Sequence, residues 1–180
     1  MTTTTQQYDR VIKSCKEIFL KKTKDYGTAW RVLRPISIID QIFIKAQRIR
    51  TIQEKKKQKI ADDITSELKG IVNYAIIGLM QLELPDDNGE DSPLEHVSSL
   101  YDTNAEAAKK IMEDKNHDYG EAWRKMSQAS FIDLILMKIQ RIRQILANDG
   151  KTLISEGIDA NYIDIINYAI FALILITEKL

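Results

Sequence analysis

Residues 22–31 read KTKDYGTAWR and residues 115–124 read KNHDYGEAWR, so one ten-residue pattern occurs twice, 93 residues apart. Further stretches recur at nearly the same spacing, namely QRIR at 47–50 and 140–143, and NYAI at 73–76 and 167–170. A repeat that spans about half of the chain indicates that one structural unit has been duplicated.

Each copy contains three segments with the spacing of helices, and the chain has few glycines or prolines to interrupt them. We therefore predict an all-α helical bundle of two tandem repeats of about three helices each, related by a pseudo-two-fold axis and packed as one globular unit. Residues 1–84 form the first repeat, residues 94–180 the second, and the polar residues 85–93 between prolines a linker.

Several residues mark where these helices begin and end. Gly27 and Gly120 follow the first helix of each repeat, where glycine adopts positive φ at little cost. Ser37 and Ser130 are expected to cap the second helices. The last helix is apolar over residues 163–176, which predicts a central position in the bundle and is too short for a membrane span of roughly 20 residues.

Composition narrows the possible functions. The chain has 26 Lys and Arg against 26 Asp and Glu, which argues against general nucleic-acid binding because that requires a basic surplus. The only cysteine, Cys15, suits a reducing compartment, and the first residues do not resemble a signal peptide. We expect a cytoplasmic protein that makes no membrane contact, and the sequence leaves a homo-oligomer open.

The second helix of each repeat carries one carboxylate followed by two cations. These are Asp40, Lys45 and Arg48 in the first repeat and Asp133, Lys138 and Arg141 in the second. A carboxylate beside cations can hold a metal ion and the phosphates bound to it. The alternative is ion pairing on a solvated helix face.

The third helix of the second repeat places Asp164, Asn167 and Tyr168 on one face of an apolar segment. A carboxylate buried there must be paired or hold a metal, so we predict that Asp164 and Asn167 are buried and hydrogen-bonded. The role is either a ligand or metal site, or a polar network that fixes helix register. Gly70 stands at the position of Asp164 in the first repeat, with Glu67 one turn earlier.

The repeated motif itself carries groups that can bind a phosphate and a base. These are Lys22, Asp25 and Tyr26, with their copies Lys115, Asp118 and Tyr119. The lysines can reach a phosphate or simply favour the negative end of the helix dipole. The tyrosines can stack on a base or sugar, or pack against the protein.

The motifs Lys-x-x-Asp-Tyr-Gly-x-Ala-Trp, Asp-x4-Lys-x-Gln-Arg-Ile and Asp-x2-Asn-Tyr-Ala together resemble the nucleotide modification associated domain type 1 family, twice over. The chain is more distantly similar to MazG-like all-α nucleoside triphosphate pyrophosphatases, which hold Mg²⁺ with acidic residues on two adjacent helices. That similarity implies a metal site of Asp133, Asp159 and Asp164, with Asp40, Asp63 and Glu67 as counterparts in the first repeat. It also implies Mg²⁺ as cofactor and a nucleotide, or another phosphate-bearing small molecule, as partner.

One carboxylate of the MazG-like pattern is missing from each half. That pattern has Glu-x-x-Glu on its first helix, whereas Phe43 stands three residues after Asp40, and Leu136 three after Asp133. Three functions stay open: a Mg²⁺-dependent (deoxy)nucleoside triphosphate pyrophosphohydrolase, a nucleotide-binding or regulatory module without turnover, and a helical assembly protein with a structural polar network.

If the chain is an enzyme, we expect Asp133, Asp164 and Lys138 to be catalytic. The residues expected to bind substrate in the second repeat are Lys115, Asp118, Tyr119, Arg141, Asn167 and Tyr168, and in the first repeat Lys22, Asp25, Tyr26, Lys45 and Arg48. Because Gly70 lacks the carboxylate of Asp164, we expect the second repeat to hold the more competent site.

Overall fold

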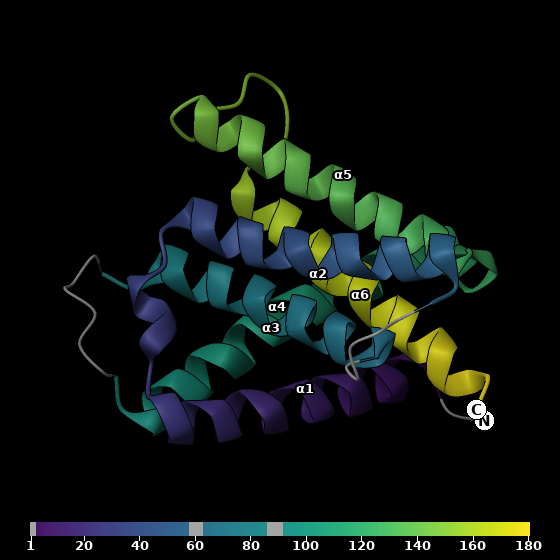
Figure 1. Cartoon of the computed structure of the whole chain (residues 1–180), viewed down its shortest axis with the longest axis horizontal. Coiled ribbons are helices and arrows are strands. Elements are labelled where there is room, and N and C mark those ends of the chain that lie inside the picture. The colour runs from purple at the N-terminus through teal and green to yellow at the C-terminus, as the bar shows by residue number, and fades with distance from the viewer. Residues whose placement is uncertain (1–2, 58–62, 86–91) are drawn as a thin grey trace.

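The computed structural model describes residues 3–57, 63–85 and 92–180, and every regular element in them is helical (Figure 1). The elements of the first half are α1 (Thr4–Tyr26), the 3-10 helix η1 (Ala29–Val32), α2 (Pro35–Lys55) and α3 (Ile64–Glu83). Those of the second half are α4 (Leu94–Tyr119), η2 (Ala122–Lys125), α5 (Gln128–Ala147) and α6 (Ile158–Glu178). The same order occurs twice, which confirms the prediction of an all-α bundle.

The predicted helix ends are right at the glycines and wrong at the serines. Gly27 and Gly120 lie directly after α1 and α4 with φ of 61° and 59°. α2 instead begins at Pro35, which suits a first helical position because it has no N–H to leave unpaired. In α5 the cap is Ser127 rather than Ser130, since the Ser127 hydroxyl accepts the Ser130 N–H at 3.1 Å.

Part of the predicted linker lies outside the described residues. Residues 86–91, which make up most of the linker placed at 85–93, are not among them.

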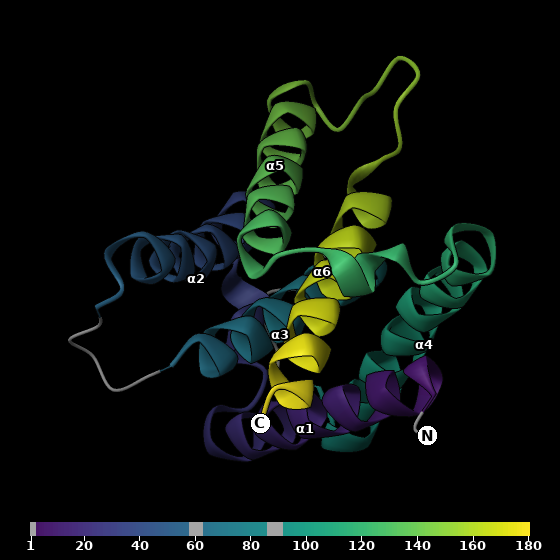
Figure 2. The same cartoon turned by 90° about the vertical axis from the view of Figure 1, so that its right-hand side faces the viewer.

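α6 forms the centre of the bundle and contacts α1, α3, α4 and α5 (Figure 2). At 21 residues, with a mean hydropathy of 1.6 in its most apolar window, this helix is long and apolar enough to cross a membrane. The sequence argument that it is too short is therefore wrong. However, 67% of that window is buried inside the bundle, and its position in the core accounts for its composition.

The two repeats exchange identical hydrogen bonds in the core. The Tyr8 hydroxyl of the first repeat donates to Asn167 Oδ1 of the second at 2.7 Å, and the Tyr101 hydroxyl of the second donates to Asn73 Oδ1 of the first at 2.7 Å. Tyr101 is the copy of Tyr8, and Asn167 is the copy of Asn73. Such reciprocity is what a two-fold relationship between the repeats requires.

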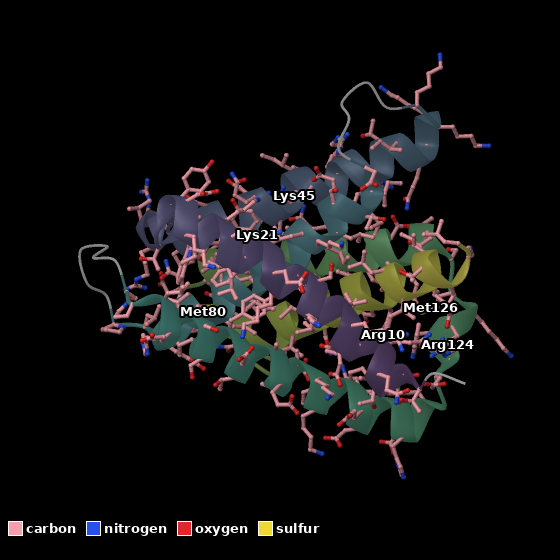
Figure 3. The ribbon with its side chains drawn as sticks, turned by 90° about the horizontal axis from the view of Figure 1, so that it is seen from below. Arg10, Lys21, Lys45, Met80, Arg124 and Met126 are labelled. Atoms are coloured by element: carbon pink, nitrogen blue, oxygen red, sulfur yellow. The ribbon has the colours of Figure 1, made fainter. Side chains whose placement is uncertain are left out.

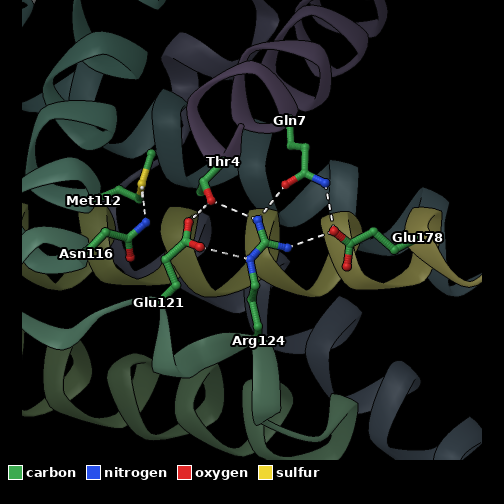
Figure 4. A network of polar contacts seen from close by, with 7 residues as sticks. All are labelled: Thr4, Gln7, Met112, Asn116, Glu121, Arg124 and Glu178. Carbon is green, nitrogen blue, oxygen red and sulfur yellow. Dashed lines mark hydrogen bonds and ion pairs between the residues drawn. The ribbon is translucent and has the colours of Figure 1, made fainter. Parts of the chain in front are cut away.

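The last residue of the second motif, Arg124, ties η2 to both ends of the chain (Figure 4). Its guanidinium donates to Gln7 and Thr4 of α1 at 2.6 and 2.8 Å, and pairs with Glu178 of α6 at 2.7 Å. Glu121 completes the cluster, with 3.3 Å between its carboxylate and Arg124 Nε. The motif therefore joins its own repeat to the other one.

Candidate functional site

Asp40 and Asp133 each pair with an arginine of the other repeat. Arg143 Nη2 lies 3.0 Å from Asp40 Oδ1, and Arg50 Nη1 lies 4.0 Å from Asp133 Oδ1. The two carboxylates are more than half exposed. These ion pairs join α2 to α5, and they follow the reciprocal pattern of the buried tyrosines.

The remaining predicted metal ligands are also dispersed. Asp63 caps α3 by accepting the Ser66 N–H at 2.8 Å, which lowers the pKa of Asp63. Asp159 is exposed in the first turn of α6. In the part of the chain that the structure describes, no three His, Cys, Asp or Glu side chains come close enough together to hold a metal ion. The donor set therefore does not fit the expected Mg²⁺ triad, since that ion prefers several oxygen ligands.

Asp164 instead binds two lysines. Its Oδ2 lies 2.7 Å from Lys138 Nζ, and its Oδ1 lies 2.9 Å from Lys115 Nζ. Lys138 is on the buried face of α5 with Ile135 and Ile142, and Lys115 is on the last turns of α4. Asp164 is 7% exposed, which confirms its predicted burial.

Two neighbours of Asp164 differ in what they do. Asn167 is buried as predicted, but its amide nitrogen donates to Ala108 O of its own repeat at 3.1 Å and its Oδ1 accepts the Tyr8 hydroxyl of the first repeat at 2.7 Å, so it belongs to the interface between the repeats. Tyr168 is half-buried, and burial followed by the charge of Asp164 raises its pKa. Arg141 is exposed, and its positive charge lowers the pKa of Tyr168.

The C-terminal ends of α1 and α4, where the repeated motif begins, are exposed to solvent. Tyr119 is 73% exposed, and the Asp118 carboxylate lies 3.2 Å from Nδ1 of the adjacent His117. In the first repeat Asp25 is exposed too, while Tyr26 stands at the rim of a cavity.

This cavity has a volume of about 520 Å³ and lies among α1, η1, α2 and α3 of the first repeat. A volume in that range accommodates a small-molecule ligand. Its described walls include four aromatic residues, three lysines and one glutamate, namely Phe19, Tyr26, Trp30, Tyr74, Lys22, Lys45, Lys69 and Glu67. The expectation that the second repeat holds the more competent site stays a prediction, and this cavity adds a candidate site in the first repeat.

The charges in the cavity are only partly neutralised. Glu67 lies 3.1 Å from Arg48 Nη1 and 3.7 Å from Lys45 Nζ. Lys45, labelled in Figure 3, also lies over the ring of Tyr74 at 5.8 Å. Lys22 forms no ion pair with any residue in the described ranges. The cavity therefore combines a positive wall with aromatic surface.

Gly70 is one position at which the two repeats differ. It lines the cavity at the position that Asp164 occupies in the second repeat. A Cβ atom added at Gly70 would lie 2.9 Å from Lys45 Cε, so even one methyl group would press on that side chain. Without a carboxylate here, Lys45 is 26% exposed, whereas its copy Lys138 is 8% exposed.

The cavity also has aromatic and basic residues that are not among the predicted binding residues, namely Phe19, Trp30 and Lys69. Phe19 and Lys69 carry no sequence signal for binding, because their copies are Met112 and Ile163. Trp30 belongs to the repeated motif, and its copy Trp123 stacks on Phe171 in the core, with ring centroids 4.2 Å apart. The first repeat has Ile77 at the position of Phe171, and Trp30 lines the cavity instead.

Comparison with known proteins agrees with the repeat. The family model described as Nucleotide modification associated domain 1 matches residues 22–82 and again residues 115–176. No curated protein and no solved structure matches the chain. Because the two matched segments cover more than half of the sequence, the chain belongs to the Nucleotide modification associated domain 1 family, in two tandem copies.

Proposed function

We propose that the protein binds a nucleotide in the first-repeat cavity and does not hydrolyse it. The observation that carries this proposal is the combination of lysines and aromatic rings around one cavity of about 520 Å³. The membership of a nucleotide-modification family agrees with such a ligand.

Phosphate binding is assigned to the lysines. Lys22 and Lys45 line the same cavity from α1 and α2, and Lys69 adds a third ammonium group from α3. Lysine is a compact cation with three donors, which suits phosphate oxygens. Because Glu67 lies 3.7 Å from Lys45, an arriving phosphate competes with a long ion pair.

Base binding is assigned to the aromatic rings. Tyr26 is 70% exposed at the rim, and Trp30 and Tyr74 line the cavity. Stacking of a base on an aromatic ring contributes about 1–3 kcal/mol and depends little on which base is present. We therefore expect the affinity to depend more on the phosphate than on the identity of the base.

The absence of turnover rests on the acidic residues. Phosphoryl chemistry by a bound metal needs several oxygen ligands around one point. Within the described ranges, Asp40, Asp133 and Glu67 each face an arginine or lysine. These carboxylates are therefore not assigned a role in Mg²⁺-dependent hydrolysis.

Calorimetric titration tests the proposal. Wild-type protein is titrated with nucleosides and with their mono-, di- and triphosphates, with and without Mg²⁺, and pyrophosphate release is followed in parallel. We expect one site, binding of phosphorylated ligands only, and no release. Lys22→Met should weaken binding, whereas Lys13→Met, an exposed lysine of the same helix outside the cavity, should not. Absence of binding, or Mg²⁺-dependent pyrophosphate release, would overturn the proposal.

A further inference from the structure

We propose that the Asp164 carboxylate takes the place of a ligand's phosphate, so that the second repeat is a closed copy of the anion site that is open in the first. This inference rests on the proposed function and deepens it. It assigns both the lysines that hold the phosphate and the class of ligand.

The second repeat gives the geometry of an occupied site. Each oxygen of Asp164 binds a different lysine, Lys138 at 2.7 Å and Lys115 at 2.9 Å. These distances are those of charge-assisted hydrogen bonds. One anionic group thus spans two ammonium groups that come from different helices.

The first repeat keeps both lysines and has no anion at the position of Asp164. Lys22 and Lys45 are the copies of Lys115 and Lys138, and both line the cavity beside Gly70. The Lys45 side chain lies directly against Gly70, with its Cε 2.9 Å from the place of a Cβ atom, and glycine supplies no carboxylate to bridge the two lysines. An anion arriving from solvent would therefore take the position that Asp164 takes from within the chain.

The size of this internal anion specifies the ligand. A single carboxylate is enough to bridge the two lysines in the second repeat. A single phosphate group is a similar bridging anion, and the same cavity is lined by aromatic residues, among them the exposed ring of Tyr26. The ligand class is therefore a nucleoside monophosphate, and additional phosphates are not needed for binding.

Glu67 explains how the open site remains stable without a ligand. It holds Lys45 loosely at 3.7 Å and Arg48 at 3.1 Å. Its copy in the second repeat is the neutral Asn161, where Asp164 performs the neutralisation instead. In each repeat one carboxylate of the third helix thus pairs with the lysine of the second helix, and the two carboxylates are displaced by one turn.

Removal of the internal anion tests the inference. Asp164→Ala opens the position but keeps a good helix former, and Asp133→Ala is the matched control at an exposed helical aspartate. Titration with a nucleoside monophosphate should give one site in the wild type and in Asp133→Ala, and two sites in Asp164→Ala. Inorganic phosphate should raise the Tm of Asp164→Ala more than that of the control.

The outcomes separate the two proposals. A wild type without any site would contradict the proposed function, whereas one site in both the wild type and folded Asp164→Ala would overturn only this inference. If Asp164→Ala is unfolded in anion-free buffer, circular dichroism decides the question. Recovery of the folded spectrum on addition of inorganic phosphate supports the inference, and failure to recover overturns it.

Discussion

Lys138 and Asp164 form a buried ion pair, with 2.7 Å between Nζ and Oδ2 and less than a tenth of either side chain exposed. The corresponding pair in the first repeat, Lys45 and Glu67, is longer at 3.7 Å and more exposed. The two copies of one duplicated unit therefore differ in how the lysine of the second helix is neutralised. In one copy the lysine is satisfied from within the chain, and in the other it faces a cavity.

Removal of the Asp164 charge should destabilise the fold. Asp164→Asn leaves Lys138 buried without an anion, and breaking a buried pair in this way costs about 3 kcal/mol in the free energy of unfolding. Urea denaturation measures the loss. The double variant Asp164→Leu/Lys138→Met, which removes both charges, should recover most of it. Equal stability of Asp164→Asn and wild type would contradict the assignment of this pair as a buried one.

The two tyrosines that join the repeats should contribute equally. Tyr8→Phe leaves Asn167 Oδ1 without its donor, and Tyr101→Phe does the same to Asn73 Oδ1. Each substitution should lower the free energy of unfolding by about 1–3 kcal/mol, the cost of an unsatisfied buried acceptor. A marked difference between the two variants in the same denaturation experiment would argue against the reciprocal arrangement.

The protein should lose stability at alkaline pH. Burial raises the pKa of Tyr8 and Tyr101 far above the ordinary value of 10.0. In the unfolded chain these phenols ionise near their ordinary pKa, so the unfolded state releases protons that the folded state retains. Stability from these groups is complete below pH 10 and falls above it, by at most about 1.4 kcal/mol per pH unit for each group. Urea denaturation at a series of pH values above 10 measures this loss. The free energy of unfolding should fall less steeply with pH in the double variant Tyr8→Phe/Tyr101→Phe than in the wild type.

Asp133 should matter little for binding. Because it is 62% exposed and 4.0 Å from Arg50, its loss should change the free energy of unfolding by less than about 1 kcal/mol. Nucleotide affinity of Asp133→Asn, measured by calorimetry with and without Mg²⁺, should equal that of the wild type. A Mg²⁺-dependent loss of affinity would restore Asp133 as a metal ligand.

The sequence predicts the fold better than the site, because repeated segments with helical spacing indicate the helices themselves but not the contacts between them. The doubled motif and the apolar segment 163–176 are sufficient to predict a bundle with two equivalent halves and a buried Asp164. The helical wheel, however, cannot show which neighbour a polar face meets. Asp40 and Asp133 look like ligands beside cations on their own helices, but the arginines that neutralise them come from the opposite repeat.

The location of the cavity could not be read from the sequence for a related reason. Gly70 reads as a lost functional carboxylate when the two copies are compared. In three dimensions Asp164 fills its own site by binding Lys115 and Lys138, whereas at Gly70 the Lys45 side chain lies against the helix and borders a cavity. A carboxylate can either contribute to ligand binding or occupy the anion position itself. Which of the two occurs depends on where the lysines lie, and this depends on the packing of three helices.

The most direct test of this account is the affinity of a nucleoside monophosphate for Gly70→Asp compared with Gly70→Asn, measured by calorimetry. The two side chains have nearly the same size, so their comparison isolates the charge beside Lys45. The account predicts that Gly70→Asp reproduces the closed state of the second repeat and weakens binding by about 100-fold relative to Gly70→Asn. Equal affinities of the two variants would contradict it.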